Sequence, residues 1–134
     1  MNFVNVEAIW EESLPSDPEG WRLEFTIPIN RSGRFQPLCE TFGRSVHGKN
    51  RDGLWIVDAL KIRPTDGKCY DDIHCWVEAV GFDGKSKHYF RFPEPVKTGH
   101  RFVYAVDDDY IFKITKVTEL CGDKSEASVV GEIQ

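Results

Sequence analysis

The sequence lacks the features of a secreted, membrane-spanning or disulfide-stabilised protein. Residues 1–10 have no basic start followed by a continuous apolar run, and no stretch of about 18 consecutive apolar residues occurs anywhere. The cysteines, Cys39, Cys69, Cys75 and Cys121, are spread along the chain without a C-x-x-C pair. We therefore expect a soluble, cytoplasmic protein with reduced thiols.

Motifs for catalysis and for cofactor binding are also missing. The chain has no Ser-centred nucleophile elbow, no H-E-x-x-H, no Walker-type glycine loop and no dinucleotide fingerprint. Five possible metal ligands lie close together in the sequence, but on a strand Asp72 and His74 would face away from Cys75. They are Cys69, Asp71, Asp72, His74 and Cys75. We expect no catalytic residue, metal or cofactor, and the sequence disfavours an enzyme without excluding one.

Basic residues are fewer than acidic ones. There are 17 Lys and Arg residues against 22 Asp and Glu, which gives a net charge of −5 and a pI near 5.3. Binding to phosphate backbones or anionic membranes needs a concentrated basic surface. The charge balance therefore disfavours nucleic acid as a partner, no membrane is expected, and a basic protein suits this chain better. A nucleic-acid role would require the basic segment at 30–53 and Trp76 or Tyr89 to share one face.

What the sequence has in quantity is aromatic residues and two-residue alternation. Nine Phe, four Trp and four Tyr favour β-strands, and 134 residues suit a single domain spanning 1–134. Within residues 21–29 the odd positions are apolar and the even positions mostly polar, which predicts a strand with one face in the core. Further strands are predicted at 3–10, 54–63, 73–82, 85–92, 101–106 and 110–120.

Two hairpins can be given a register. Asp83-Gly84 suits a two-residue turn, so residues whose numbers add up to 167 should face each other across the first hairpin. A three-residue loop at 107–109 would set Tyr104 opposite Phe112 in the second. These hairpins indicate a mainly β fold, either an antiparallel barrel or a two-sheet sandwich of about seven strands. The predicted pairs are Cys75–Phe92, Val77–Phe90, Ala79–His88, Gly81–Ser86, Trp76–Arg91, Glu78–Tyr89 and Val80–Lys87 in the first hairpin, and Val106–Tyr110, Tyr104–Phe112 and Phe102–Ile114 in the second.

Residues 30–53 depart from this pattern. They show no alternation and are too many for a plain loop in a compact domain. We expect at most one short helix there, beginning at Pro37 and running through Val46, with Leu38 and Phe42 on its inner side.

The charge distribution gives the leading functional hypothesis. The 30–53 segment is basic, whereas acidic residues gather in the loop after residue 10 and at 107–109. Opposite fields of this kind steer association and select partners, so we expect a non-catalytic protein-binding domain, an inhibitor or immunity-type protein for a basic partner. The expected contacts are Arg31, Arg34, Arg44, Lys49, Arg51, Asp107, Asp108 and Asp109.

The alternative is a barrel that binds a small molecule in an aromatic pocket, with or without catalysis. Asp58 interrupts an otherwise apolar strand face, and His88 falls on the core face of the first hairpin. An ionised carboxylate in a core needs a partner or a cavity, and a core histidine usually bonds to backbone through one ring nitrogen. His88 and Asp58 are therefore the candidate pocket residues.

Overall fold

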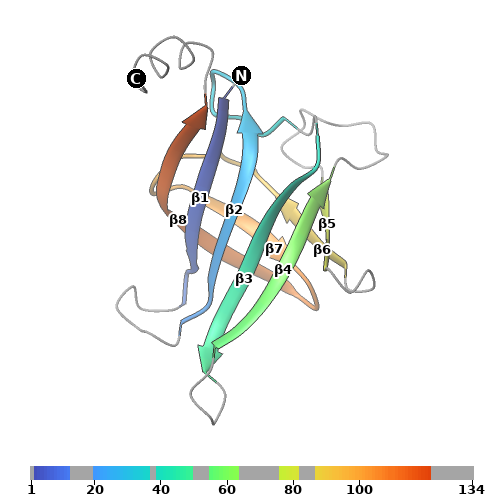
Figure 1. The fold of residues 1–134 in the computed structure, drawn as a ribbon. Helices are drawn as coiled ribbons and strands as arrows, with labels where there is room; N and C mark the ends of the chain where they lie inside the picture. Colours follow the sequence, from blue (N-terminus) through green and yellow to red (C-terminus); the bar gives the residue numbers. More distant parts are fainter. Residues whose placement is uncertain are drawn as a thin grey trace, which may run out of the picture.

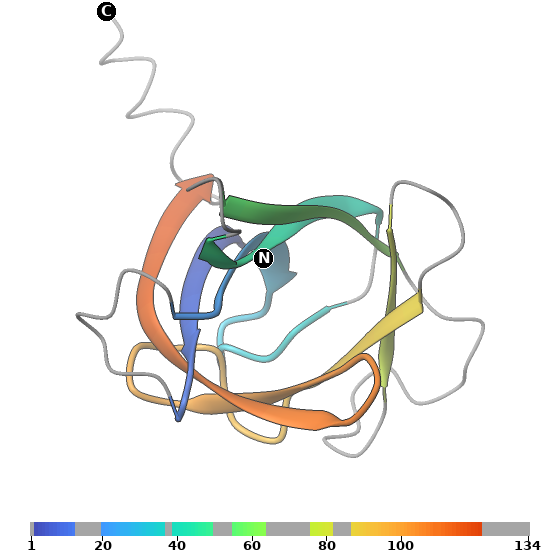
Figure 2. The same ribbon diagram turned by 90° about the horizontal axis from the view of Figure 1, so that it is seen from below.

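The computed structural model describes residues 2–12, 20–36, 39–49, 55–63, 76–81 and 87–121, which form a closed antiparallel barrel. Each strand pairs with its neighbours in the sequence, and the last strand pairs with the first, so the ring in Figure 2 has no free edge. The predicted β fold is thereby confirmed in its barrel form. The strands are β1 (Asn2–Trp10), β2 (Arg22–Ile29), β3 (Thr41–Lys49), β4 (Trp55–Arg63), β5 (Val77–Gly81), β6 (Lys87–Arg91), β7 (Arg101–Ala105) and β8 (Asp109–Cys121).

The barrel has two unlike ends, which Figure 1 shows at the top and bottom. At the upper rim β1 begins and β2 ends, since Asn2 pairs with Ile29; at the lower rim Ile9 pairs with Arg22. The β3–β4 ribbon extends below the other strands at the lower rim. No helix long and apolar enough to cross a membrane is found in the described ranges.

Aromatic side chains fill the middle of the barrel. The rings of Phe25 and Phe90 have centroids 5.1 Å apart, and those of Phe25 and Phe102 are 5.5 Å apart. All three side chains are fully buried. Burying a phenylalanine stabilises a fold by about 1.5–3 kcal/mol, so the predicted alternation is realised as a packed core. The apolar odd positions of β2 confirm it directly: Leu23, Phe25, Ile27 and Ile29 are buried.

The loop between β2 and β3 closes the upper rim. Phe35 pairs through its backbone with Ile29, and its ring lies 5.4 Å from that of Phe92. The loop is fixed from the other side because Val96 donates its N–H to the carbonyl of Gly33 at 2.7 Å. Gly33 has a φ of 81°, which favours glycine. Buried polar side chains lie at more than one level: Thr41 begins β3 near this rim, whereas Ser45 lies four residues further along the strand, toward the lower rim.

The predicted helix at 37–46 is wrong, because Thr41–Lys49 form β3. The strand was not recognised because its pattern is inverted: Ser45, 3% exposed, points inward, whereas Phe42, 54% exposed, points outward. Gly43 also weakens the alternation of apolar and polar residues, because this inward position carries no side chain. A Cβ at Gly43 would lie 2.5 Å from the Cβ of Phe25, so only glycine fits where β2 and β3 approach each other.

The β5–β6 register is confirmed over the four pairs Val77–Phe90, Glu78–Tyr89, Ala79–His88 and Val80–Lys87. The turn at 82–86 lies outside the described residues. The β7–β8 prediction was right about a three-residue loop but wrong about its place: Ala105 pairs with Asp109, and Tyr104 therefore faces Tyr110 instead of Phe112. Asp108 turns the chain one residue earlier than predicted, because its carbonyl accepts the N–H of Val106 and its carboxylate accepts the N–H of Asp109.

Candidate functional site

The predicted basic residues do not form one patch. Arg31 and Arg34 lie in the loop at the upper rim, where the Arg34 guanidinium donates to the carbonyl of Pro93 at 3.1 Å. Lys49 ends β3, nine residues long, at the opposite end of the barrel. Strands rise about 3.3 Å per residue, so roughly 25 Å separates the two groups. Arg51 lies outside the described residues.

Two acidic segments, in contrast, come together at the lower rim. Because β8 closes the barrel against β1, the residues that follow β1 lie beside the β7–β8 hairpin, and Glu11 donates its N–H to the carbonyl of Ile111 at 2.9 Å. Between them is a cleft of about 270 Å³, which we call the acidic cleft. It is lined by Trp10, Glu11, Glu12, Asp108, Asp109, Tyr110 and Ile111.

The carboxylates of the acidic cleft are only partly neutralised. Arg101 pairs with Glu11, with Nε and Oε1 2.5 Å apart. Among the described residues no cation forms an ion pair with Glu12, Asp108 or Asp109. A group of carboxylates without a paired cation is the complement of a lysine or arginine side chain.

Aromatic rings form the inner side of the acidic cleft. Trp10 and Tyr110 meet edge to face, with centroids 6.0 Å apart and ring planes at 84°. The Tyr110 hydroxyl donates to Asp107 at 2.8 Å, and this hydrogen bond, with the nearby negative charges, raises the pKa of Tyr110. Trp21 packs against Tyr110, with ring centroids 4.7 Å apart. The cleft therefore combines acidic groups with ring faces, an arrangement that attracts cations.

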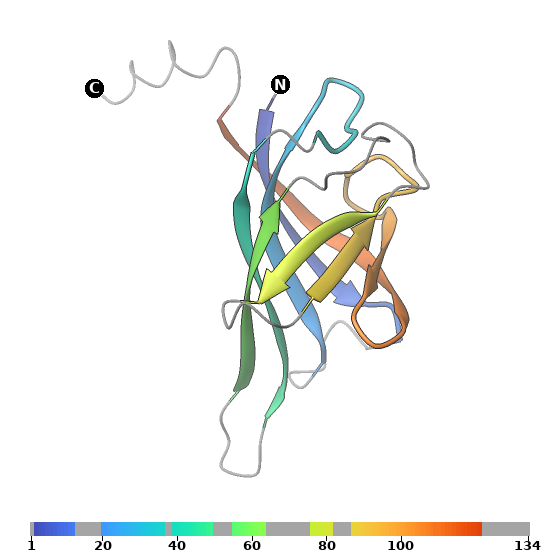
Figure 3. The ribbon, with the colours of Figure 1, turned by 90° about the vertical axis from the view of Figure 1, so that its right-hand side faces the viewer.

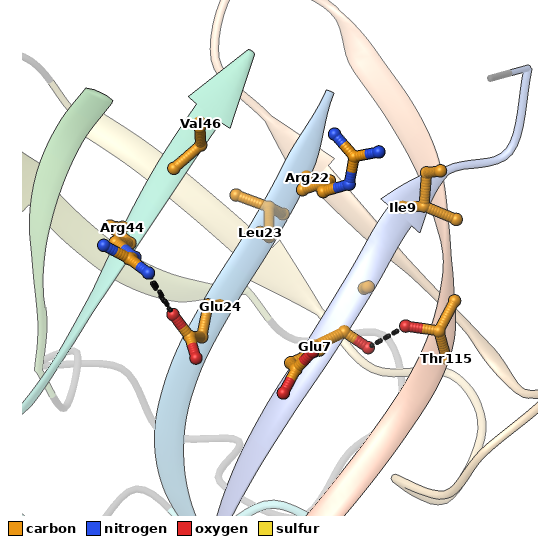
Figure 4. Close-up of a pocket in the computed structure, with 9 residues that line it drawn as sticks. Glu7, Ile9, Arg22, Leu23, Glu24, Arg44, Val46 and Thr115 are labelled. Carbon is orange, nitrogen blue, oxygen red and sulfur yellow. Dashed lines mark hydrogen bonds and ion pairs between the residues drawn. The ribbon is translucent and has the colours of Figure 1, made fainter. Parts of the chain in front are cut away.

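A second hollow, the outer groove, lies next to the acidic cleft on the barrel wall (Figure 4). It has a volume of about 420 Å³ and carries both signs of charge. Arg44, one of the predicted contact residues, pairs there with Glu24 at 2.9 Å. The groove lies over a β-bulge between β1 and β8, where the Thr115 hydroxyl donates to the Glu7 carbonyl at 3.1 Å. It is lined by Glu7, Ala8, Ile9, Arg22, Leu23, Glu24, Arg44, Val46 and Thr115.

His88 lies on the core face, as predicted, and one of its partners there is the phenol of Tyr104. The His88 side chain is 6% exposed, and Nδ1 lies 2.5 Å from the hydroxyl of Tyr104. Burial raises the pKa of Tyr104, the nearby charge of Asp58 adds to this, and a hydrogen bond with Ser45 opposes it. Tyr104 therefore stays protonated, and its hydroxyl donates to Nδ1 in the tautomer of His88 that carries its proton on Nε2.

Ser45 connects this buried pair to the lower rim. The indole N–H of Trp21 donates to the Ser45 hydroxyl at 2.7 Å. Trp21 also contacts Tyr104, with ring centroids 5.8 Å apart, and Phe112, at 5.1 Å. The hydrogen-bonded chain thus runs from His88 in the interior to Trp21, which packs against the rings of the acidic cleft.

The expectation that Asp58 lies in the core is wrong. Its backbone pairs with that of Ser45, whose side chain is buried, yet the Asp58 side chain is exposed. The reason is that β5 pairs with β4 only from Leu60 to Arg63, so Asp58 lies beyond the end of that pairing. The β3–β4 ribbon extends past the other strands at the lower rim (Figure 3). Asp58 and His88 therefore differ in burial, and Asp58 needs no buried partner.

Sequence reasoning found Asp108 and Asp109 but not their companions. Glu11 and Glu12 were recognised as acidic, but nothing local in the sequence indicates that β8 returns to β1. Of the described residues, no group of three or more His, Cys, Asp or Glu could hold a metal ion. The predicted ligand cluster at 69–75 lies outside the described ranges. No protein-family model, curated protein or solved structure matches this chain.

Proposed function

We propose that this protein binds a basic protein partner through the acidic cleft. The observation that supports this best is the meeting of two acidic segments, one after β1 and one in the β7–β8 hairpin, around a single hollow. Such a protein acts by occupying the basic surface of its partner, as a cytoplasmic inhibitor or immunity-type protein does, and needs no catalytic residue of its own.

Electrostatics supports the choice of a basic partner. The chain carries a net charge of −5, and Glu12, Asp108 and Asp109, which pair with no cation in the described part of the chain, concentrate part of it at one rim. A field of one sign accelerates encounter with an oppositely charged surface, and this acceleration weakens as salt is added. The partner that benefits is one with lysine and arginine side chains at its own contact surface.

The aromatic rings supply the affinity that exposed charges do not. Exposed ion pairs contribute only about 0.2–1 kcal/mol each. A cation against the face of a tryptophan or tyrosine adds about 0.5–2 kcal/mol, depending on how far it is desolvated. Trp10 and Tyr110 line the same cleft as the carboxylates. One inserted lysine or arginine side chain would therefore contact both kinds of group.

The outer groove extends this surface along β1. Glu7 and Ile9 line the groove, and Trp10 begins the acidic cleft, so a partner segment that leaves the cleft meets the groove next. There the Arg44–Glu24 pair presents both signs of charge. A surface of mixed sign disfavours partners whose charges are out of register, which supports selective binding.

The alternative prediction is a small-molecule pocket inside the barrel. The packing of the core disfavours it, because aromatic side chains occupy the interior. Above His88 the interior is occupied by the rings of Phe90, Phe102 and Tyr104. The ring of His88 itself stacks on that of Tyr104, with centroids 5.6 Å apart. We therefore place binding on the outer surface of the lower rim.

The test uses a short arginine-rich peptide and matched charge variants of the full chain. Asp108→Asn with Asp109→Asn removes two charges from the acidic cleft while retaining side chains that accept hydrogen bonds. Glu40→Gln with Glu119→Gln removes two charges from exposed sites outside the cleft, so both variants have the same net charge. Peptide affinity is measured by isothermal titration calorimetry at low and physiological salt.

We expect the cleft variant to bind about 5–30-fold more weakly than the wild type, corresponding to 1–2 kcal/mol. The control variant should lose less than half of that free energy. Equal losses in the two variants would show that the peptide responds only to net charge and would contradict a defined site at the acidic cleft.

A further inference from the structure

The outward face of β4, β5 and β6 has a different character from the rest of this acidic molecule. Figure 3 shows these strands toward the viewer. Their register places outward side chains side by side, with Arg63 opposite Glu78 and Glu78 opposite Tyr89. We call this face the basic wall. It comprises Lys61, Arg63, Trp76, Glu78, Lys87, Tyr89 and Arg91.

The basic wall is a local positive field on a negative chain. Its four cations, with Glu78 and with Glu40, which pairs with Lys61 at 4.0 Å, give a net charge of +2, which leaves −7 for the rest of a chain whose total is −5. Glu78 is less exposed than its partners: its side chain is 18% exposed, whereas those of Arg63 and Lys87 are 42% and 61% exposed. An approaching polyanion therefore meets the cations before it meets Glu78.

Arg91 is held by an aromatic ring. Its guanidinium carbon lies 5.1 Å from the ring centroid of Trp76, and no carboxylate among the described residues forms an ion pair with it. The ring of Tyr89 meets that of Trp76 at 81°, with centroids 6.5 Å apart. Two half-buried rings thus lie among cations whose charge is only partly cancelled.

We propose that the basic wall binds single-stranded nucleic acid. Lysine and arginine contact the phosphates, while bases stack on Trp76, Tyr89 and the guanidinium of Arg91. The rings decide between polyanions: an acidic peptide has no bases to stack, and a duplex keeps its base faces inside. In the closed order of strands, β4 and β5 lie across the barrel from β8 and β1. A nucleic acid on the basic wall therefore leaves the acidic cleft free.

The experiment measures fluorescence anisotropy of a dye-labelled oligothymidylate with the full-length protein at about 50 and 200 mM salt. For four neutralised phosphates, affinity should fall about 50-fold over this range, because the logarithmic slope is about −0.7 per contact with a single strand. Trp76→Leu tests stacking, and Arg91→Gln and Lys87→Gln test charge. Lys113→Gln, an exposed lysine on β8, is the control for net charge. Circular dichroism and thermal melting confirm that each variant is folded.

Stacking contributes about 1–3 kcal/mol per base, so Trp76→Leu should weaken binding at least 5-fold. Lys87→Gln should weaken binding and reduce the slope of log affinity against log salt by the amount of about one phosphate contact. Lys113→Gln should leave both the affinity and the slope nearly unchanged. Absence of binding at low salt would overturn the proposal. So would displacement of the oligonucleotide by polyglutamate combined with full affinity in folded Trp76→Leu, since that would indicate a site for acidic polymers.

Discussion

Replacing Tyr104 with phenylalanine tests whether the hydrogen bonds inside the barrel, next to the lower rim, stabilise the fold. The phenol is 1% exposed, and its hydroxyl lies 2.5 Å from Nδ1 of His88. Tyr104→Phe removes this bond, worth about 0.5–1.5 kcal/mol net, and leaves a buried ring nitrogen without its phenol partner, which costs about 1–3 kcal/mol. The added apolar character of phenylalanine offsets part of this. We expect a loss of about 2 kcal/mol in the free energy of unfolding.

Tyr110→Phe is the matched control, because it removes the same hydroxyl from an exposed bond to Asp107. It should change stability by less than about 0.5 kcal/mol. Both variants are unfolded in urea, and the midpoints are compared at equal slope so that the differences report stability alone. If Tyr104→Phe is as stable as Tyr110→Phe, the buried hydroxyl does not stabilise the interior and the inferred chain from His88 to Trp21 is wrong.

Three further outcomes follow from the packing and the charges. Gly43→Ala should lower the free energy of unfolding by about 1–3 kcal/mol in urea, because its Cβ would lie 2.5 Å from that of Phe25; wild-type stability would refute this close approach. Burial raises the pKa of Tyr104, so above about pH 10 the unfolded chain releases a proton that the folded chain retains, and stability falls by up to about 1.4 kcal/mol per pH unit. The curve of Tyr104→Phe against pH should be flatter there, and parallel curves would contradict it. Glu24→Gln breaks an exposed ion pair with Arg44 and should change the free energy of unfolding by less than about 0.5 kcal/mol. A loss above about 1 kcal/mol would show that this ion pair stabilises the fold more than an exposed pair should.

The parts of the fold that the sequence predicts are those set by neighbouring residues. The β5–β6 register follows from an Asp-Gly dipeptide between two β-rich runs, and its four described pairs are confirmed. The β7–β8 register failed by one position in each strand, because loop length was predictable but the residue that turns the chain, Asp108, was not.

β3 was missed for a different reason. Its inward positions include Gly43 and Ser45, and its outward positions include Phe42, so hydrophobicity along the strand points to the wrong face. Glycine is required there by the approach of β2, and Ser45 by the bond that Trp21 donates. Both requirements come from distant strands and leave no periodic signal in residues 41–49.

The candidate site was half predictable. The sequence shows two acidic segments, which include Glu11, Glu12, Asp108 and Asp109. That these segments lie around one cleft depends on the pairing of the first strand with the last. Closure of a barrel is a property of the whole chain, and hairpin signals do not contain it. The expected burial of Asp58 is wrong for a similar reason, because it depends on where β4 extends beyond β5.

The central claim is that the acidic cleft is the surface through which a basic protein binds. The most direct test is hydrogen exchange of the full-length protein, free and in a purified stoichiometric complex with its partner from the source cells. We expect slower amide exchange in the complex at Trp10–Glu12 and Asp108–Ile111, with little change at Arg31–Arg34. Protection confined to the upper rim, with exchange at Trp10–Glu12 and Asp108–Ile111 unaltered, would contradict it.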